Sequence, residues 1–223
     1  MTDEGGAYSS LHTMAVLSFA LGLLSLLSFA PFWIFVWIFP AAAVLTGALA
    51  LWRITEAPEV WSGSKLARAG IGLGLFCGVG AASIDFYTKS QISKYGRAAS
   101  DRFMEKIKAG ELEAAFWLTM PRDARDAVGK NGVEGLPTEM LEKYAVFRME
   151  FGHDAEELMA GEGTYEFETV EHAFVEDGSE YAAVVYKLKS PHEETRILIT
   201  ASSLTSPLTY EKTWFIRDHK LGY

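Results

Sequence analysis

Hydrophobic positions fill most of the first third of the chain and leave it almost free of charge. Forty residues, from Thr13 to Trp52, contain no Asp, Glu, Lys or Arg, and a second uncharged run covers residues 69–84. About 20 helical residues cross the ~30 Å hydrocarbon core of a bilayer. The first run is therefore long enough for two membrane spans and the second for one. The pattern predicts an N-terminal tail over residues 1–12 and an α-helical membrane anchor over 13–86, with spans at about 13–30, 32–52 and 66–86.

Two prolines are candidates for the break between the first two spans. Pro31 lies in a cluster of aromatic residues, and such rings settle at the headgroup level of a bilayer. This favours a tight turn at Pro31, because proline lacks an N–H and clashes with the preceding helical turn. The alternative is a longer first helix, with Pro40 opening the second. In both cases we expect the second span to end at Trp52–Arg53.

The third predicted span carries glycines at a four-residue spacing. Gly70, Gly74 and Gly78 share one helix face, and such small residues let another backbone approach closely. We predict that this face packs against the first two spans, and self-association into a homo-oligomer is the alternative. Asp85 lies at the outer end of the span, where we expect its carboxylate in the interface rather than in a proton relay.

Basic residues near the spans bear on orientation. Three lie in the short loop 53–68 and four follow the third span, so the two sides are nearly balanced. We give more weight to the short loop, since positive charges in short loops favour the cytoplasmic side. The expected orientation has the N-terminus inside and the C-terminal part outside. The four residues after the span are Lys89, Lys94, Arg97 and Arg102.

After Tyr87 the apolar positions follow a helical period. Gly110 either kinks the first of these helices or separates two abutting ones, and Pro121 ends the run. From Tyr165 the period falls to two, which is typical of a half-buried strand, and Asp177–Gly178 predicts a hairpin. Helices followed by antiparallel strands predict an α+β domain over residues 87–223. Helices are expected at about 99–118, at 122–128 and from Pro137–Thr138 to about Met149, and further strands near 180–189, 195–204 and 209–217.

Charge separates the two parts of the chain further. Residues 1–84 contain three basic and four acidic side chains, whereas residues 85–223 contain 17 basic and 25 acidic ones. An acidic domain makes nucleic acid an unsuitable partner, because phosphate binding needs a basic face. The N-terminus has no Lys or Arg before the apolar run, so we expect the first segment to be retained rather than cleaved as a secretory signal.

Two resemblances extend this interpretation. LSFALGLLSLL, PAAAVLTGALALWRI and LARAGIGLGLFCGVG, all within residues 13–84, resemble a widespread bacterial membrane module of unknown function, which pairs apolar segments and ends in a Gly-rich helix. That resemblance implies anchoring and no activity. The Ala109-Gly110-Glu111 step inside the run from Phe103 to Phe116, together with the late Trp214-Phe-Ile, resembles the nuclear transport factor 2-like superfamily. Its members wrap a curved antiparallel sheet around helices to form a cone, and they include isomerases, dehydratases and domains without chemistry.

The sequence contains no established catalytic motif. Five histidines are scattered and none is spaced with another for a shared metal, and the single Cys77 lies inside an apolar run. His153–Asp154, at the end of the predicted third helix, is the one adjacent pair that could serve acid–base chemistry, and a solvated helix end is the favoured interpretation. His172, beside Glu171 on a predicted strand, is equally well explained as an exposed position. No catalytic residue, metal or cofactor is predicted.

Eleven acids and no Lys or Arg lie between Arg148 and Lys187. A solvated acidic face is the favoured interpretation, and a surface for a basic partner is the alternative. The sequence thus predicts a membrane-anchored, non-catalytic binding or structural protein of the bacterial cell envelope. Its α+β domain would be presented outside the cytoplasmic membrane to a small ligand, a peptide or a protein. An enzyme that uses the cone as a pocket and a self-assembling membrane scaffold are the alternatives.

Overall fold

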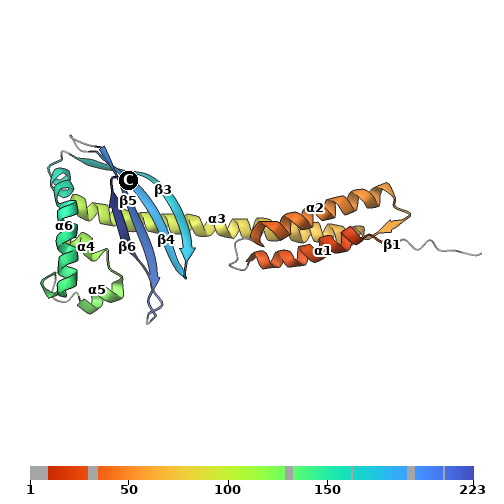
Figure 1. Cartoon of the computed structure of the whole chain (residues 1–223), viewed down its shortest axis with the longest axis horizontal. Helices are drawn as coiled ribbons and strands as arrows, with labels where there is room; N and C mark the ends of the chain where they lie inside the picture. The colour runs from red at the N-terminus through yellow and green to blue at the C-terminus, as the bar shows by residue number, and fades with distance from the viewer. Residues whose placement is uncertain (1–9, 30–34, 129–132, 162, 190–193, 208) are drawn as a thin grey trace, which may run out of the picture. The chain divides into compact units, whose positions relative to one another are not determined.

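The computed structural model describes residues 10–29, 35–128, 133–161, 163–189, 194–207 and 209–223. The chain divides into two compact units, residues 1–87 and 88–223, which contain mainly helices and a helix–sheet assembly respectively (Figure 1). Each unit has its own packing and is described separately.

The first unit consists of helices and one short parallel bridge. Its elements are β1 (Ser10–Leu11), α1 (Thr13–Leu24), the 3-10 helix η1 (Ser25–Phe29), α2 (Phe35–Glu56), β2 (Trp61–Ser62) and the first part of α3 (Ser64–Lys108). β1 pairs in parallel with β2, through Ser10 with Trp61 and Leu11 with Ser62. Because α1 follows β1 directly and α3 follows β2 directly, the starts of α1 and α3 lie at the same end of the unit.

The first apolar helix is shorter than predicted. α1 ends at Leu24 rather than near residue 30, and η1 continues to Phe29. The Ser25 hydroxyl donates to the carbonyl of Leu21 at 2.9 Å, a serine-to-backbone bond that often tightens or bends a helix. A break at Pro40 is wrong, since Pro40 lies inside α2. The alternative break at Pro31 lies outside the described residues. α2 also continues one turn beyond Trp52, to Glu56.

Two described helices are long and apolar enough to cross a membrane. They are α2, over Trp37–Glu56, and α3, and each has only 28% of its apolar window buried. The first apolar segment, Thr13–Phe29, has 17 residues and falls short of that length. Of the three predicted spans, the structure thus shows two helices of spanning length and one shorter apolar segment.

Small residues occupy the interior of the first unit. The buried positions are Ala, Ser, Gly, Cys and Pro with Ile54 and His12, whereas most leucine, phenylalanine and tryptophan side chains along α1, α2 and α3 are exposed and the others are half-buried. His12 is the N-cap of α1 and accepts from the Met14 N–H through Nδ1 at 3.2 Å. Water-soluble helix assemblies bury large apolar side chains, so this unit has the opposite arrangement.

The glycine face of α3 lies against the other two helices. A Cβ at Gly70 would lie 2.4 Å from the Ser18 hydroxyl of α1, and one at Gly74 would lie 3.0 Å from the Pro40 carbonyl of α2. A Cβ at Gly78 would also contact Pro40, at 3.1 Å. The face singled out in the sequence is therefore filled by α1 and α2 of the same chain.

The second unit begins with helices. They are the rest of α3, α4 (Leu112–Trp117), α5 (Arg122–Val128), the 3-10 helix η3 (Val133–Gly135) and α6 (Thr138–Met159). Of the two alternatives at Gly110, the abutting helices are present, because α3 ends at Lys108 and Gly110 has φ of +69°. α6 runs ten residues beyond the predicted end at Met149, since Phe151, Ala155 and Leu158 bury one face of the added turns.

A four-stranded antiparallel sheet completes this unit, in the order β3-β4-β5-β6. The predicted α+β domain is therefore confirmed at that level. Asp177 and Gly178 both have positive φ and join β3 to β4 as a two-residue hairpin. The last strand lies about three residues later than predicted, because the Ser206 N–H first donates to the Glu211 carbonyl. The strands are β3 (Thr164–Glu176), β4 (Ser179–Lys189), β5 (Glu194–Thr205) and β6 (Lys212–Leu221).

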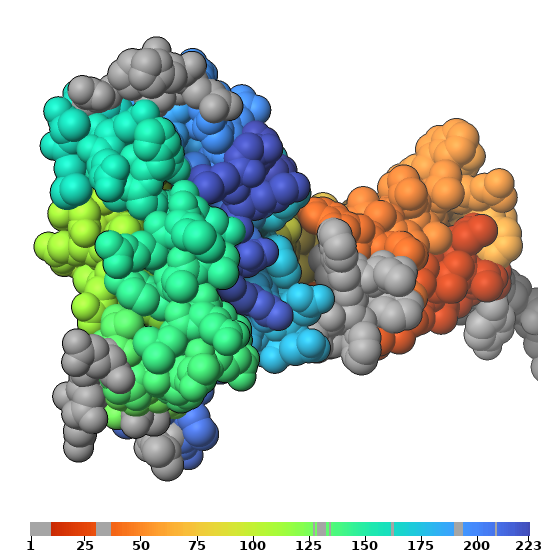
Figure 2. Space-filling view, turned by 60° about the vertical axis from the view of Figure 1, so that its left-hand side comes forward, coloured from red at the N-terminus to blue at the C-terminus, as the bar shows by residue number. Residues whose placement is uncertain are grey.

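The core of the second unit lies between the helices and the sheet. In Figure 2, α6 covers one face, with β6 beside it. Aromatic rings from α3, α4 and α6 pack edge to face and tilted against one another, as in Phe103 on Phe151 and Phe147 on Phe151, with centroids 5.6 and 4.9 Å apart. Tyr186 and the isoleucines of β5 and β6 fill the sheet side. Side chains of the described residues thus fill the centre of the space between the helices and the sheet.

Candidate functional site

A cavity of about 330 Å³ opens in the second unit between α3, α5 and β6. Its wall combines aromatic and strongly basic side chains. Tyr95 and Arg102 come from α3, Arg125 from α5, and Lys212 and Trp214 from β6. The described lining contains neither histidine nor carboxylate, the side chains that most often act as general bases.

Two close contacts fix the walls of this cavity. A Cβ at Gly96 would lie 2.2 Å from the Cβ of Ala182, so only glycine lets α3 lie this near β4. The Ile216 N–H donates to the carbonyl of Leu118 at 2.8 Å and ties the α4–α5 connection to the open edge of β6. These contacts place α3, α5 and β6 around one space.

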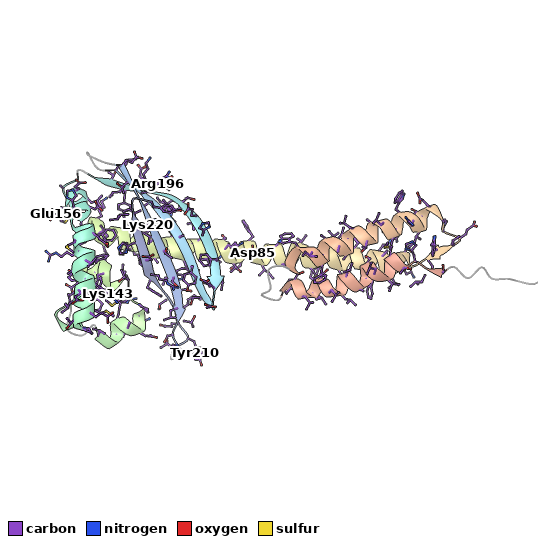
Figure 3. All side chains as sticks on the ribbon, viewed as in Figure 1. Asp85, Lys143, Glu156, Arg196, Tyr210 and Lys220 are labelled. Carbon is purple, nitrogen blue, oxygen red and sulfur yellow. The ribbon has the colours of Figure 1, made fainter. Side chains whose placement is uncertain are left out.

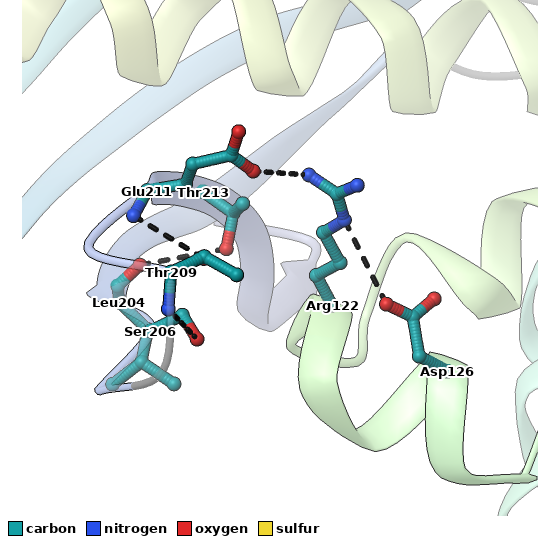
Figure 4. A network of polar contacts seen from close by, with 7 residues as sticks. All are labelled: Arg122, Asp126, Leu204, Ser206, Thr209, Glu211 and Thr213. Atoms are coloured by element: carbon teal, nitrogen blue, oxygen red, sulfur yellow. Dashed lines mark hydrogen bonds and ion pairs between the residues drawn. The ribbon is translucent and has the colours of Figure 1, made fainter.

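Two of the four cations around the cavity have acidic partners. The Arg122 guanidinium donates to Glu211 at 2.7 Å and lies 3.7 Å from Asp126 (Figure 4). The turn before β6 holds Glu211 in place, since the Glu211 N–H donates to the Thr209 hydroxyl at 3.4 Å. Lys212 donates to Glu180 at 2.7 Å. Arg122 and Lys212 are therefore largely neutralised.

The other two cations, Arg102 and Arg125, have no acidic partner within hydrogen-bonding distance among the described residues. The Nε of Arg125 is buried there without a hydrogen-bond partner. Burial lowers the pKa of the Arg125 guanidinium, the neighbouring Arg122 lowers it further, and Asp126 raises it. A buried guanidinium N–H without an acceptor is costly, so this group is suited to receive an anion.

The histidine pairs singled out in the sequence do not line this cavity. His153 lies within α6 rather than at its end, on the surface, with its Nε2 3.3 Å from Glu157. Its neighbour Asp154 is half-buried on the same helix. His172 is exposed on β3, and Glu171 accepts from the Tyr223 hydroxyl at 2.6 Å. The structure brings neither pair to a common site.

Unlike either of these pairs, His219 joins two distant elements, and no pattern in the sequence predicts this contact. Its Nε2 lies 2.9 Å from Glu150 of α6, and its ring lies 4.8 Å from that of Phe151. Sixty-nine residues separate His219 from Glu150, so no local spacing could have linked them. Tilted and edge-to-face ring contacts, together with the Glu150 carboxylate, tie β6 to α6.

Much of the acidic segment is paired with distant basic or hydroxyl groups. Glu166 accepts from Lys189, Glu168 from Arg196 and Glu180 from Lys212, each across neighbouring strands or the sheet. Glu150, Glu157 and Glu171 also have the partners described above. Glu156 and Arg196 are labelled on the surface in Figure 3. The surface is thus less uniformly negative than the sequence predicted, which weakens the case for a basic partner.

Asp85 is exposed on α3 and is labelled in Figure 3. Within the described residues, no three His, Cys, Asp or Glu side chains gather closely enough to hold a metal ion. Comparison of the chain with protein-family models, with curated proteins and with solved structures found no match.

Proposed function

We propose that this protein is a membrane-anchored, non-catalytic binding protein of the bacterial cell envelope. The first unit would hold it in the cytoplasmic membrane, and the α+β domain would bind a small ligand outside. The observation that carries the proposal is the packing of the first unit, in which small residues are buried and large apolar ones are exposed. Helices in lipid pack in this way, because lipid tails are as apolar as leucine and small residues allow close approach.

The proposed anchor has three spans. α1 and η1 together reach about 28 Å, at roughly 1.5 Å per α-helical and 2.0 Å per 3-10 residue, which is close to the ~30 Å of the hydrocarbon core. The parallel bridge between β1 and β2 supports the same topology, since it needs the N-terminal segment and the 53–68 loop at one end. We propose the N-terminus inside and the C-terminal domain outside. The resemblance to the bacterial membrane module suits this arrangement.

The second unit supports binding over catalysis. Its interior is filled by aromatic and aliphatic side chains, and the cavity at its rim is lined by cations and rings. We propose that its helices and sheet form a nuclear transport factor 2-like cone whose ligand site is that rim cavity. An isomerase- or dehydratase-like enzyme would need a buried histidine or carboxylate near the cavity. A scaffold assembled through Gly70, Gly74 and Gly78 would first have to displace α1 and α2 from that face.

The membrane part of the proposal can be tested at Phe76, which lies in the middle of the third span and is 70% exposed. In lipid, Phe76→Arg would cost roughly 3–4 kcal/mol at the span centre, whereas in water an exposed arginine costs almost nothing. We expect Phe76→Arg to lose the carbonate-resistant membrane fraction that wild type and Phe76→Leu retain. Tyr210→Arg, on the second unit, is the control for added charge. Wild-type-like recovery of Phe76→Arg would reject the anchor.

A further inference from the structure

We infer that the cavity between α3, α5 and β6 is a binding site for a small organic anion, a carboxylate or phosphate carried on a short apolar body. This inference rests on the proposed binding function and names its ligand class. An acidic domain with a formal excess of acids would not gather basic side chains around one cavity without a use for them, because like charges repel.

The charge balance inside the cavity favours an anion. Arg122 and Lys212 have carboxylate partners, at 2.7 Å in both cases. Arg102 and Arg125 have no carboxylate within hydrogen-bonding distance in the described part of the chain, although Asp126 acts on Arg125 from further away. The wall therefore carries two guanidinium groups without a directly bonded carboxylate. Guanidinium forks bind carboxylate and phosphate groups through two parallel N–H bonds. An anion bound in this cavity would supply the acceptor that the buried Nε of Arg125 lacks, and Arg102 also lines the cavity.

A further donor lies on the edge of the sheet. The Ile216 N–H points away from β5, because it donates to Leu118. Outward-pointing groups recur at every second residue of an edge strand, so the N–H of Trp214 points the same way. Trp214 lines the cavity. The same cavity wall therefore combines a neutral backbone donor with the two guanidinium groups.

The rest of the cavity wall determines the size and the apolar character of the group that carries the anion. Tyr95, Ala98, Ala99, Leu118 and the Trp214 ring supply apolar and aromatic surface. A volume of about 330 Å³ is at the lower end for small-molecule sites. A polymer or a long acyl chain would not fit, whereas a single ring or a short aliphatic chain would.

Calorimetric titration of the full chain in a neutral detergent tests this inference. The probes are benzoate and phenyl phosphate. Neutral benzamide is the shape-matched control, and inorganic phosphate is the anion that lacks an apolar group. We expect benzoate or phenyl phosphate to bind at least 10-fold more tightly than benzamide and inorganic phosphate. Binding should weaken as salt is raised from 50 to 500 mM, because salt screens the attraction.

Substitutions then locate the site. Arg125→Gln and Arg102→Gln should each weaken benzoate binding by at least 10-fold, and Arg125→Lys, which keeps the charge but not the fork, by less. Arg148→Gln, at an exposed position of α6, is the matched control and should change nothing. Arg102 is exposed on a long helix, so its variant remains folded even if Arg125→Gln does not. Equal affinities for benzoate and benzamide, or binding unchanged in Arg102→Gln, would overturn the inference.

A lipid headgroup offers the same phosphate chemistry as a free ligand. Repeating the titration in detergent doped with phosphatidylglycerol separates the two sources, since a headgroup in the cavity would compete with benzoate. Unchanged benzoate affinity would assign the cavity to a free anion. Failure of all probes in wild-type protein that still resists carbonate extraction would reject this inference and leave the membrane anchor standing. Loss of carbonate resistance would reject the anchor without bearing on the cavity.

Discussion

At the scale of single residues, one polar contact of the second unit joins a fully buried tyrosine to an aspartate. The Tyr186 ring is fully buried between helices and sheet, and its hydroxyl donates to Asp101 of α3 at 2.6 Å. Asp101 also pairs with Arg97 at 3.5 Å. Burial, followed by the bond to Asp101, raises the pKa of Tyr186. The protonated hydroxyl is therefore part of the folded core.

This contact predicts a dependence of stability on alkaline pH. Because the folded pKa is raised above the unfolded value of about 10, the contribution of Tyr186 is fully present below pH ~10 and is lost as pH rises further. Tyr186→Phe should cost about 1 kcal/mol at pH 7 and should reduce the loss of stability above pH 10. Hydrogen exchange of β4 peptides between pH 7 and 11 measures both effects. Tyr210→Phe, at a position 83% exposed, should keep the wild-type slope, and an unchanged slope in Tyr186→Phe would contradict the assignment.

Residue-level chemistry was the part least accessible from sequence. The pairs His153–Asp154 and His172–Glu171 are adjacent in sequence, and adjacency alone drew attention to them. Arg102, Arg125 and Trp214 lie far apart along the chain and meet only because α5 folds back to β6. Arg122 and Arg125 lie three residues apart on one helix, and this spacing was the sign of a basic cluster that the sequence offered. The net negative charge of the domain drew attention away from it.

At the scale of elements, the contacts of α3 with α1 predict which glycines are indispensable. A Cβ at Gly70 would meet the backbone and hydroxyl of Ser18 at 2.4–2.6 Å, whereas one at Gly72 would meet nothing within 4 Å. Overpacking typically costs about 1–3 kcal/mol, so Gly70→Leu should lower the melting temperature in detergent by roughly 2–10 °C. Gly72→Leu is the matched control and should melt as wild type does. Equal melting of the two variants would show that α1 does not contact α3 through this face.

The junction between α3 and α4 gives a second prediction at this scale. Gly110 and Gly161 both have positive φ, of +69° and +75°. A Cβ at Gly110 would meet the Met159 sulfur at 2.2 Å, and one at Gly161 would meet nothing within 4 Å. Alanine at either position pays about 1–2 kcal/mol for the left-handed backbone. Gly110→Ala should be the more destabilising in urea unfolding of the second unit, and the difference measures the Met159 contact. A greater loss in Gly161→Ala would contradict it.

Elements were predictable where one local period dominated. The hairpin at Asp177–Gly178 and the α+β order followed from alternation and turn chemistry alone. The end of α6 did not, because Gly152 and a run of acids interrupt the pattern before Phe151, Ala155 and Leu158 resume it on the buried face. The early end of α1 depends on a serine hydroxyl that turns back to its own backbone. A hydropathy profile cannot show that bond, since a serine has the same hydropathy value whether or not its hydroxyl bonds to the backbone.

At the scale of the whole molecule, the forty uncharged residues predict a membrane anchor, and the charges of the flanking loops leave its predicted orientation nearly balanced. Folding adds the parallel bridge of β1 with β2, which fixes two loops to one end of the unit. It does not say which end faces the cytoplasm. Orientation is therefore a separate prediction, and the chain offers a simple way to measure it.

We expect the loop before α3 to face the cytoplasm and the second unit to face outward. In a Cys77→Ser background, which removes the single native thiol, Glu59→Cys and Tyr210→Cys each place one thiol at an exposed position. A membrane-impermeant maleimide applied to intact cells should label Tyr210→Cys, and it should label Glu59→Cys only after permeabilisation. The reverse pattern would invert the orientation. Equal labelling of both would show that α3 does not cross the membrane, since among the described residues it is the one helix between the two positions with the length and apolarity of a span.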